Sequence, residues 1–184
     1  MSHTSGLFGE SAMRLAQRDV DGPLADDVLL HQLSSKLECQ REAALRRIAK
    51  DKELVRLNPD KVAVLLQDSS GLVRAAAVSA LVPVTTMRYD ANFLPLPGGR
   101  QISEFGMAVV PLLEDEHYLV RIEALRSVGT YPEVLITPKE EAMIVAILMD
   151  DRSPAVRREA VAALGAAPTL LYKYRDILER MMPG

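Results

Sequence analysis

A motif that recurs four times along the chain constrains its fold more than any other feature of the sequence. Each copy begins with an arginine, continues after two residues with an alanine and an aliphatic residue, and adds a second aliphatic residue three positions later. The arginines are Arg41, Arg74, Arg121 and Arg157, separated by 33, 47 and 36 residues. Periods of this length are typical of helical-repeat proteins, in which each unit buries its apolar face by stacking on its neighbours.

The register of the motif extends upstream of the arginine. An aspartate stands six residues before three of the arginines, and Ser35 takes its place in the first copy. These aspartates are Asp68, Asp115 and Asp151. Bulky apolar residues occupy the positions eight and nine before the same three arginines, and a valine stands twelve before. Because several positions keep one register, the repeat has much stronger support than a single match would give.

Each unit of the repeat predicts two helices, with the arginine motif on the second. Apolar residues at helical spacing, such as Val62, Leu65 and Leu66, predict a first helix. Glycines that follow the motif, Gly129 and Gly165, predict the ends of two second helices. Three pairs place a capping residue before a first-turn proline: Asn58-Pro59, Thr137-Pro138 and Ser153-Pro154.

Two further features concern the last unit. Thr137 and Glu140 have the spacing of a capping box. Beyond the fourth motif, a single helix over about residues 170–182 is expected to cover the last exposed apolar face, as a terminal cap does in repeat proteins.

The composition agrees with close helix packing. Hydrophobic residues make up 48% of the chain, but aromatic residues only 4%, and tryptophan is absent. A core of Ala, Leu, Val, Ile and Met suits helices and is poor material for a β-sandwich. The net charge of −3 disfavours a dedicated nucleic-acid binder, which is usually basic.

The single cysteine, Cys39, excludes an internal disulfide framework and a multi-cysteine metal site. Cysteine usage of this kind fits a reducing compartment, so we expect the cytoplasm or an organelle interior. We expect the Cys39 thiol to be buried or inert, although it stands near a predicted helix start. No apolar run reaches the roughly 18–20 residues that a bilayer crossing needs, so no membrane insertion is expected.

Over about residues 24–166, the repeated Val, Asp, Arg and Ala positions resemble the HEAT-repeat family. The resemblance implies an all-α fold, a right-handed α-solenoid of about four helix pairs with a C-terminal capping helix. The chain then divides into an N-terminal extension at 1–23 and one repeat domain at 24–184. An insertion at 85–101, rich in proline and glycine, separates the second and third repeats.

The recurring charged residues have two interpretations. In the first, the aspartates cap the turns before the second helices, and Arg74, Arg121 and Arg157 reach adjacent turns or the neighbouring repeat's aspartate. The result is a ladder between units, as the resemblance implies for these positions. In the second interpretation, the arginines form a row that binds phosphate. The ladder is favoured, because each arginine comes with its own aspartate and a paired guanidinium is not free for a ligand.

Further arginines lie on the second helices outside the apolar stripe: Arg46, Arg47, Arg126 and Arg158. They are candidates for a basic patch on the inner surface that the second helices line in HEAT-like proteins. A solvated helix face is the simpler interpretation, because Glu42, Glu123 and Glu159 stand close to them in the sequence.

The insertion collects much of the scarce aromatic and apolar content of the chain in Tyr89, Phe93, Leu94 and Leu96. Exposed apolar groups of this kind attract partners, and loops on rigid scaffolds often carry function. These four residues either fold back over the repeats or form a docking element.

Residues suited to catalysis are few. The histidines, His3, His31 and His117, form no His-Glu pair, so the chain lacks the ligands of the HEAT-like di-iron hydroxylases. No glycine-rich loop leads into a lysine as a phosphate site would require. We therefore expect no catalytic residue, no cofactor and no metal ion.

The sequence thus predicts a binding module, a scaffold, adaptor or accessory subunit that contacts a protein partner. One alternative is a carrier that resembles the HEAT-like bilin lyases and holds an open-chain tetrapyrrole. Another is a binder of phosphate or nucleic acid that uses the second-helix arginines, and its binding would weaken with salt.

Overall fold

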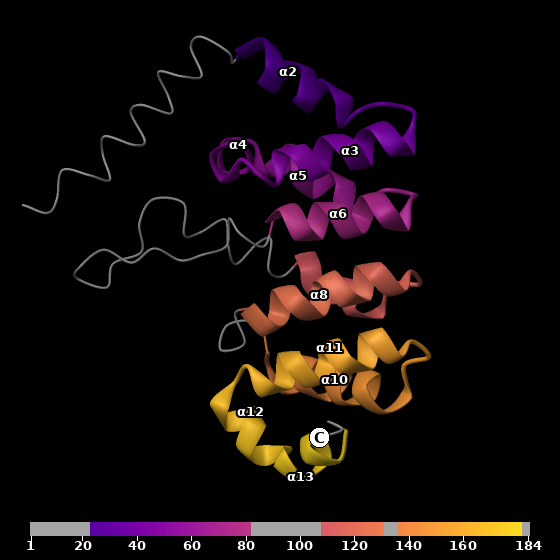
Figure 1. Cartoon of the computed structure of the whole chain (residues 1–184), viewed down its shortest axis with the longest axis vertical. Coiled ribbons are helices and arrows are strands. Elements are labelled where there is room, and N and C mark those ends of the chain that lie inside the picture. Colours follow the sequence, from indigo (N-terminus) through magenta and orange to yellow (C-terminus); the bar gives the residue numbers. More distant parts are fainter. Residues whose placement is uncertain (1–22, 82–107, 131–135, 182–184) are drawn as a thin grey trace, which may run out of the picture.

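The computed structural model describes residues 23–81, 108–130 and 136–181, and every element in these ranges is a helix. The all-α class predicted from the sequence is confirmed for this part of the chain. Helices lie one above another along the longest axis of the molecule (Figure 1). In chain order, the first elements are α2 (Pro23–Gln32), α3 (Glu38–Ile48), α4 (Lys52–Leu57), α5 (Pro59–Ala63), the 3₁₀ helix η1 (Val64–Gln67) and α6 (Gly71–Leu81). The later elements are the 3₁₀ helix η3 (Val110–Glu114), α8 (Tyr118–Thr130), α10 (Pro138–Asp150), α11 (Pro154–Gly165), α12 (Pro168–Lys173) and α13 (Arg175–Met181).

Four helices that carry the arginine motif form a continuous row. Helix α3 packs on α6, α6 on α8, and α8 on α11. The alanine three positions after each motif arginine is fully buried in all four helices: Ala44, Ala77, Ala124 and Ala160. A small side chain at this position lets adjacent helices approach to the short end of the usual interaxial distance of roughly 8–10 Å.

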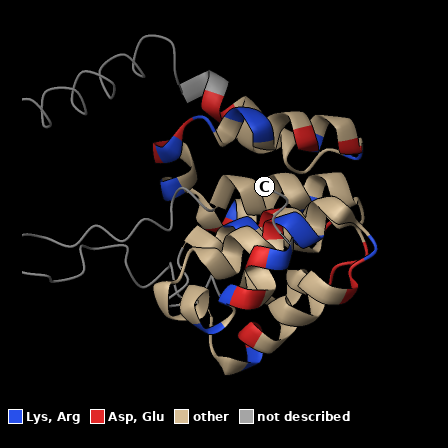
Figure 2. Cartoon of the chain, turned by 60° about the horizontal axis from the view of Figure 1, so that its bottom comes forward, with Lys and Arg blue, Asp and Glu red and all other residues tan. Residues whose placement is uncertain are grey.

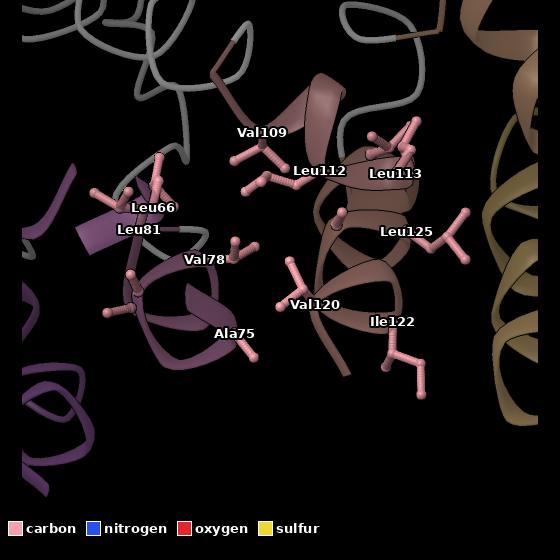
Figure 3. Packing of buried hydrophobic residues seen from close by; sticks show 14 of the residues in the cluster. Leu66, Ala75, Val78, Leu81, Val109, Leu112, Leu113, Val120, Ile122 and Leu125 are labelled. Carbon is pink, nitrogen blue, oxygen red and sulfur yellow. The ribbon is translucent and has the colours of Figure 1, made fainter. Parts of the chain in front are cut away.

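A second layer packs against this row. Helix α5 and η1 contact α6, η3 contacts α8, and α10 contacts α11. The paired leucines of η1 and η3 are buried: Leu65, Leu66, Leu112 and Leu113. Helix α10 instead remains α-helical to Asp150, which buries Leu148 and leaves Met149 56% exposed. Figure 3 shows Leu112 and Leu113 of the second layer and Val120 of α8 in one apolar core with Val78 of α6.

One unit contains a helix beyond the two that the repeat pattern predicts. The short helix α4 stands between α3 and α5, where the repeat pattern predicted no separate element. The Asp51 side chain starts it by accepting hydrogen bonds from the backbone N–H groups of Glu53 and Leu54. At its other end the Asn58 side-chain amide donates to the Leu54 carbonyl at 3.2 Å.

The predicted helix starts are right in position and only partly right in mechanism. Prolines stand in the first turns of α5, α10 and α11, and Thr137 and Glu140 form the predicted capping box. Asn58 and Ser153 make no side-chain capping bond. Asn58 is engaged with the end of α4, and the backbone N–H of Ser153 donates to the Asp151 carboxylate at 2.8 Å.

The structure corrects two predictions about where helices end. The single helix expected at 170–182 is two helices, α12 and α13, which meet at Tyr174 with φ −107° and ψ 13°. Gly129 does not end α8, because Thr130 is still helical. A Cβ atom at Gly129 would lie 3.0 Å from the Cα of Ala163, so this glycine permits the close contact between α8 and α11.

Replacing Gly129 with alanine should therefore destabilise the fold, because the added methyl meets backbone atoms of α11 that cannot move independently. We expect a loss of about 1–3 kcal/mol in the free energy of unfolding, measured by urea denaturation. Gly165→Ala is the matched control, since a Cβ there meets nothing within 4 Å. It should be neutral or stabilise the chain by up to about 1 kcal/mol. Equal effects of the two substitutions would contradict the packing role of Gly129.

Candidate functional site

The motif arginines bind the aspartates of the next unit along the row. Arg41 contacts Asp68, Arg74 contacts Asp115, and Arg121 contacts Asp151. In each pair Nε donates to one carboxylate oxygen and Nη2 to the other, at 2.7–2.9 Å. We call these three bidentate pairs the rungs of a ladder.

Each guanidinium is also held by its own unit. The Nη1 atom donates to the backbone carbonyl six residues earlier, at 2.7–2.8 Å, in all four copies: Ser35, Asp68, Asp115 and Asp151. This bond turns Nε and Nη2 toward the following unit. Because the fork of donors in arginine is planar and rigid, fixing one side fixes the direction of the other.

The aspartates likewise act in two directions. One oxygen of each carboxylate accepts a hydrogen bond from the backbone N–H two residues later, at 2.8 Å, from Ser70, His117 and Ser153. These N–H groups lie at or before the start of the following second helix, where a negative charge is favoured by the helix dipole. The carboxylate thus starts one helix and holds the arginine of the previous one.

The rungs are largely withdrawn from water. The side chains of Arg74 and Asp115 are 10% and 8% exposed. Burial alone would raise the pKa of Asp68, Asp115 and Asp151, but hydrogen bonds from the arginine and from a backbone N–H outweigh it. The pKa of each carboxyl is therefore held below its usual value.

The two ends of the ladder differ from its middle. At the first, Ser35 replaces an aspartate, and its hydroxyl donates to Gln40 at 2.5 Å. At the last, Arg157 makes the usual Nη1 bond to the Asp151 carbonyl, but within the described residues no carboxylate meets its Nε and Nη2 atoms. The phosphate-binding interpretation is disfavoured for Arg74 and Arg121, because their donors are already used.

An open groove lies on the face of the row, across α6, α8 and α11. Its volume is about 520 Å³. Small or polar residues line much of it: Ser79, Gly129, Thr130, Ala162 and Ala163. The absence of bulky side chains at these positions leaves room for a segment of another molecule to approach the helix backbones.

A charged triad also lines this groove. Arg126 donates to Glu123 at 2.8 Å on its own helix and to Glu159 of α11 at 3.1 Å. Arg126 is 52% exposed, whereas the two glutamate side chains are 21% and 18% exposed. Burial raises the pKa of Glu123 despite the nearby guanidinium. The position expected to contribute to a basic patch is therefore accompanied by two carboxylates.

The remaining predicted arginines occupy exposed positions. Arg46 pairs with Glu42 one turn away at 2.7 Å, and Arg47 and Arg158 are exposed. Figure 2 shows basic and acidic residues interspersed over the helices rather than gathered into a patch of one sign. The insertion residues Tyr89, Phe93, Leu94 and Leu96 lie outside the described residues.

The structure adds or corrects the positions of three side chains. Cys39 is exposed in the first turn of α3, so of the two expected alternatives, a buried or an inert thiol, the first is wrong. Tyr172 is 84% exposed, whereas the Tyr174 hydroxyl donates to Glu141 and ties the α12–α13 junction to α10. No group of three or more potential metal-ligating side chains occurs in residues 23–81, 108–130 and 136–181.

Two engineered proteins with crystal structures from the Northeast Structural Genomics Consortium are similar to this chain. One has a TM-score of 0.59 at 18% sequence identity, covering 82% of this chain and 68% of that protein. The other has a TM-score of 0.60 at 17% identity, covering 83% and 67%. Comparison with family models and with curated proteins finds no match. At this level of identity the likeness concerns the fold alone.

The helices that the structure describes also include none with the length and apolar character needed to cross a membrane.

Removing one partner of a rung should be costly, because it leaves a buried charge without its counter-ion. We expect Asp151→Ala to lower the free energy of unfolding by about 3–5 kcal/mol, measured by urea denaturation, because Asp151 is the carboxylate that pairs with Arg121 among the described residues. Glu179→Ala is the control, since it breaks a pair with Arg175 in which both side chains are more than 60% exposed. That change should cost no more than about 0.5 kcal/mol. Similar losses in both variants would show that the rung has no special weight.

The rungs should also make stability depend on acid pH. The folded pKa of each aspartate lies below its unfolded value of 3.8, so the unfolded chain binds more protons. The stabilisation is present above about pH 4 and is lost as pH falls through the folded pKa. Asp68→Asn should be less stable at neutral pH and should lose less stability on acidification. Urea midpoints measured between about pH 7 and pH 2 would check this, and parallel curves for the two proteins would contradict it.

Proposed function

We propose that the chain is a non-catalytic scaffold or adaptor that binds a protein partner. In this proposal the stack of helices is a right-handed HEAT-like solenoid of about four helix pairs, closed at its C-terminal end by α12 and α13. Three equivalent rungs between consecutive motif helices support a repeating architecture. Proteins of this kind present extended surfaces built from the same positions of successive units.

The groove across α6, α8 and α11 is the observation that carries the proposal. It is bordered by small residues, of which Ser79 and Ala162 are exposed, whereas Ala163 is buried at its base. The half-exposed Arg126 lies at its side with Glu123 and Glu159. A partner segment could bury apolar surface on the small residues and exchange hydrogen bonds with the charged ones, which is the usual division of work in protein interfaces.

A bulky residue in this groove should weaken partner binding without unfolding the chain. Ala162→Trp fills the groove from an exposed position on α11, so the core is not disturbed. We expect the dissociation constant for a partner identified by co-purification, and then titrated in purified form, to rise at least about tenfold. Val64→Trp, at a residue 72% exposed in η1 of the other layer, is the matched control and should bind normally. Undiminished binding by the Ala162 variant would remove the groove from the proposal.

A further inference from the structure

The last guanidinium of the ladder has the geometry of a rung but lacks its acid. In the first three copies, the Nη1 bond to the carbonyl accompanies a carboxylate on Nε and Nη2. Arg157 keeps the Nη1 bond at 2.7 Å, so its fork is held in the same way. Among the described residues no acid occupies it.

Acids near the C-terminal end are engaged elsewhere. Glu179 pairs with Arg175 at 2.9 Å, and Glu141 binds Lys173 at 2.6 Å. Asp176 stands in the first turn of α13, where its backbone carbonyl accepts from Arg180, and its carboxylate makes no ion pair with Arg157. Helices α12 and α13 cover α11 through apolar residues such as Leu170 and Leu178, and they supply no fourth aspartate to the ladder.

We infer that the Arg157 fork is a docking point for a carboxylate side chain of a different protein, presented as Asp68, Asp115 and Asp151 are presented within this chain. The three filled rungs define what fits: an aspartate or glutamate at a turn, approaching in the plane of the guanidinium. Bidentate pairs of this kind combine charge with directional specificity. The inference goes beyond the proposed groove, because it places a second contact at the end of the row.

Head-to-tail stacking of a second copy would not supply the missing acid. Head-to-tail stacking would bring the first unit of one copy onto the last unit of another, and that unit carries Ser35 where the others carry aspartate. The Ser35 hydroxyl is also occupied, since it donates to Gln40 and accepts from the Leu37 backbone. Within residues 23–81, 108–130 and 136–181 the ladder therefore has a donor end without a matching acceptor end, which favours a heterologous partner.

The test uses the full-length ¹⁵N-labelled protein and follows the arginine Nε–H resonances by NMR. The probe is an end-capped hexapeptide that copies residues 112–117 with both glutamates replaced by glutamine, so that aspartate is its only acid. The control peptide has asparagine in place of that aspartate. We expect the Arg157 signal to shift saturably with the aspartate peptide, at least about tenfold more tightly than with the control. The signals of Arg41, Arg74 and Arg121 should not move, because their forks are filled.

Variants separate the fork from simple charge. Arg157→Lys keeps the charge but loses the planar fork, so it should lose most of the affinity, as should Arg157→Gln, measured in all variants by the backbone amide resonances of α11. Arg158→Gln, which removes the exposed arginine next along α11, should bind like the wild type. Equal binding of both peptides, or full affinity in Arg157→Lys, would overturn the inference. It would also fall if the free protein already shows an Arg157 signal like those of the filled rungs, or if it forms oligomers that Arg157→Gln dissolves.

Discussion

A carboxylate that serves two helices at once is the interaction on which the rest of the structure depends. Each ladder aspartate accepts a backbone N–H at the start of one motif helix and the guanidinium fork of the previous one. The start of a helix and its placement against its neighbour are therefore fixed by the same side chain. A buried ion pair of this kind contributes little net stability compared with apolar residues, but it specifies one register.

The free energy that holds the row together comes from elsewhere. The buried alanines of the motif, with Gly129, allow close contact between α3, α6, α8 and α11, and the leucines of the second layer complete the apolar core. Apolar burial is non-directional, so it would tolerate sliding of one helix along the next. The rungs do not tolerate it, because sliding one helix along the next lengthens or bends two directional hydrogen bonds at once. Apolar packing thus stabilises the contact between adjacent helices, and the ladder fixes their register.

The features that the sequence could predict are those that recur in every copy of the repeat. The motif helices, their buried alanines and the residues of the ladder all recur in register, so each copy supports the others. Helix α4 and the break at Tyr174 occur once and depend on single contacts, such as Asn58 with Leu54 and Tyr174 with Glu141. The charged triad of Arg126, Glu123 and Glu159 was partly predictable. Arg126 stands five residues after its motif arginine and Glu159 two after the next, so the register itself could have paired them.

The ladder also defines two kinds of interval along the chain: one whose length is fixed and one whose length can vary. From each aspartate to the arginine of its own unit the distance is six residues, and the Nη1 bond depends on that number. Between the partners of a rung the chain runs for 27, 41 and 30 residues, yet the pairs meet at the same distances. Because the cost of closing a loop grows slowly with its length, insertions are cheap in the second kind of interval. The segment from 82 to 107 falls in the longest of them, where new sequence can be acquired or lost while Arg74 and Asp115 stay matched.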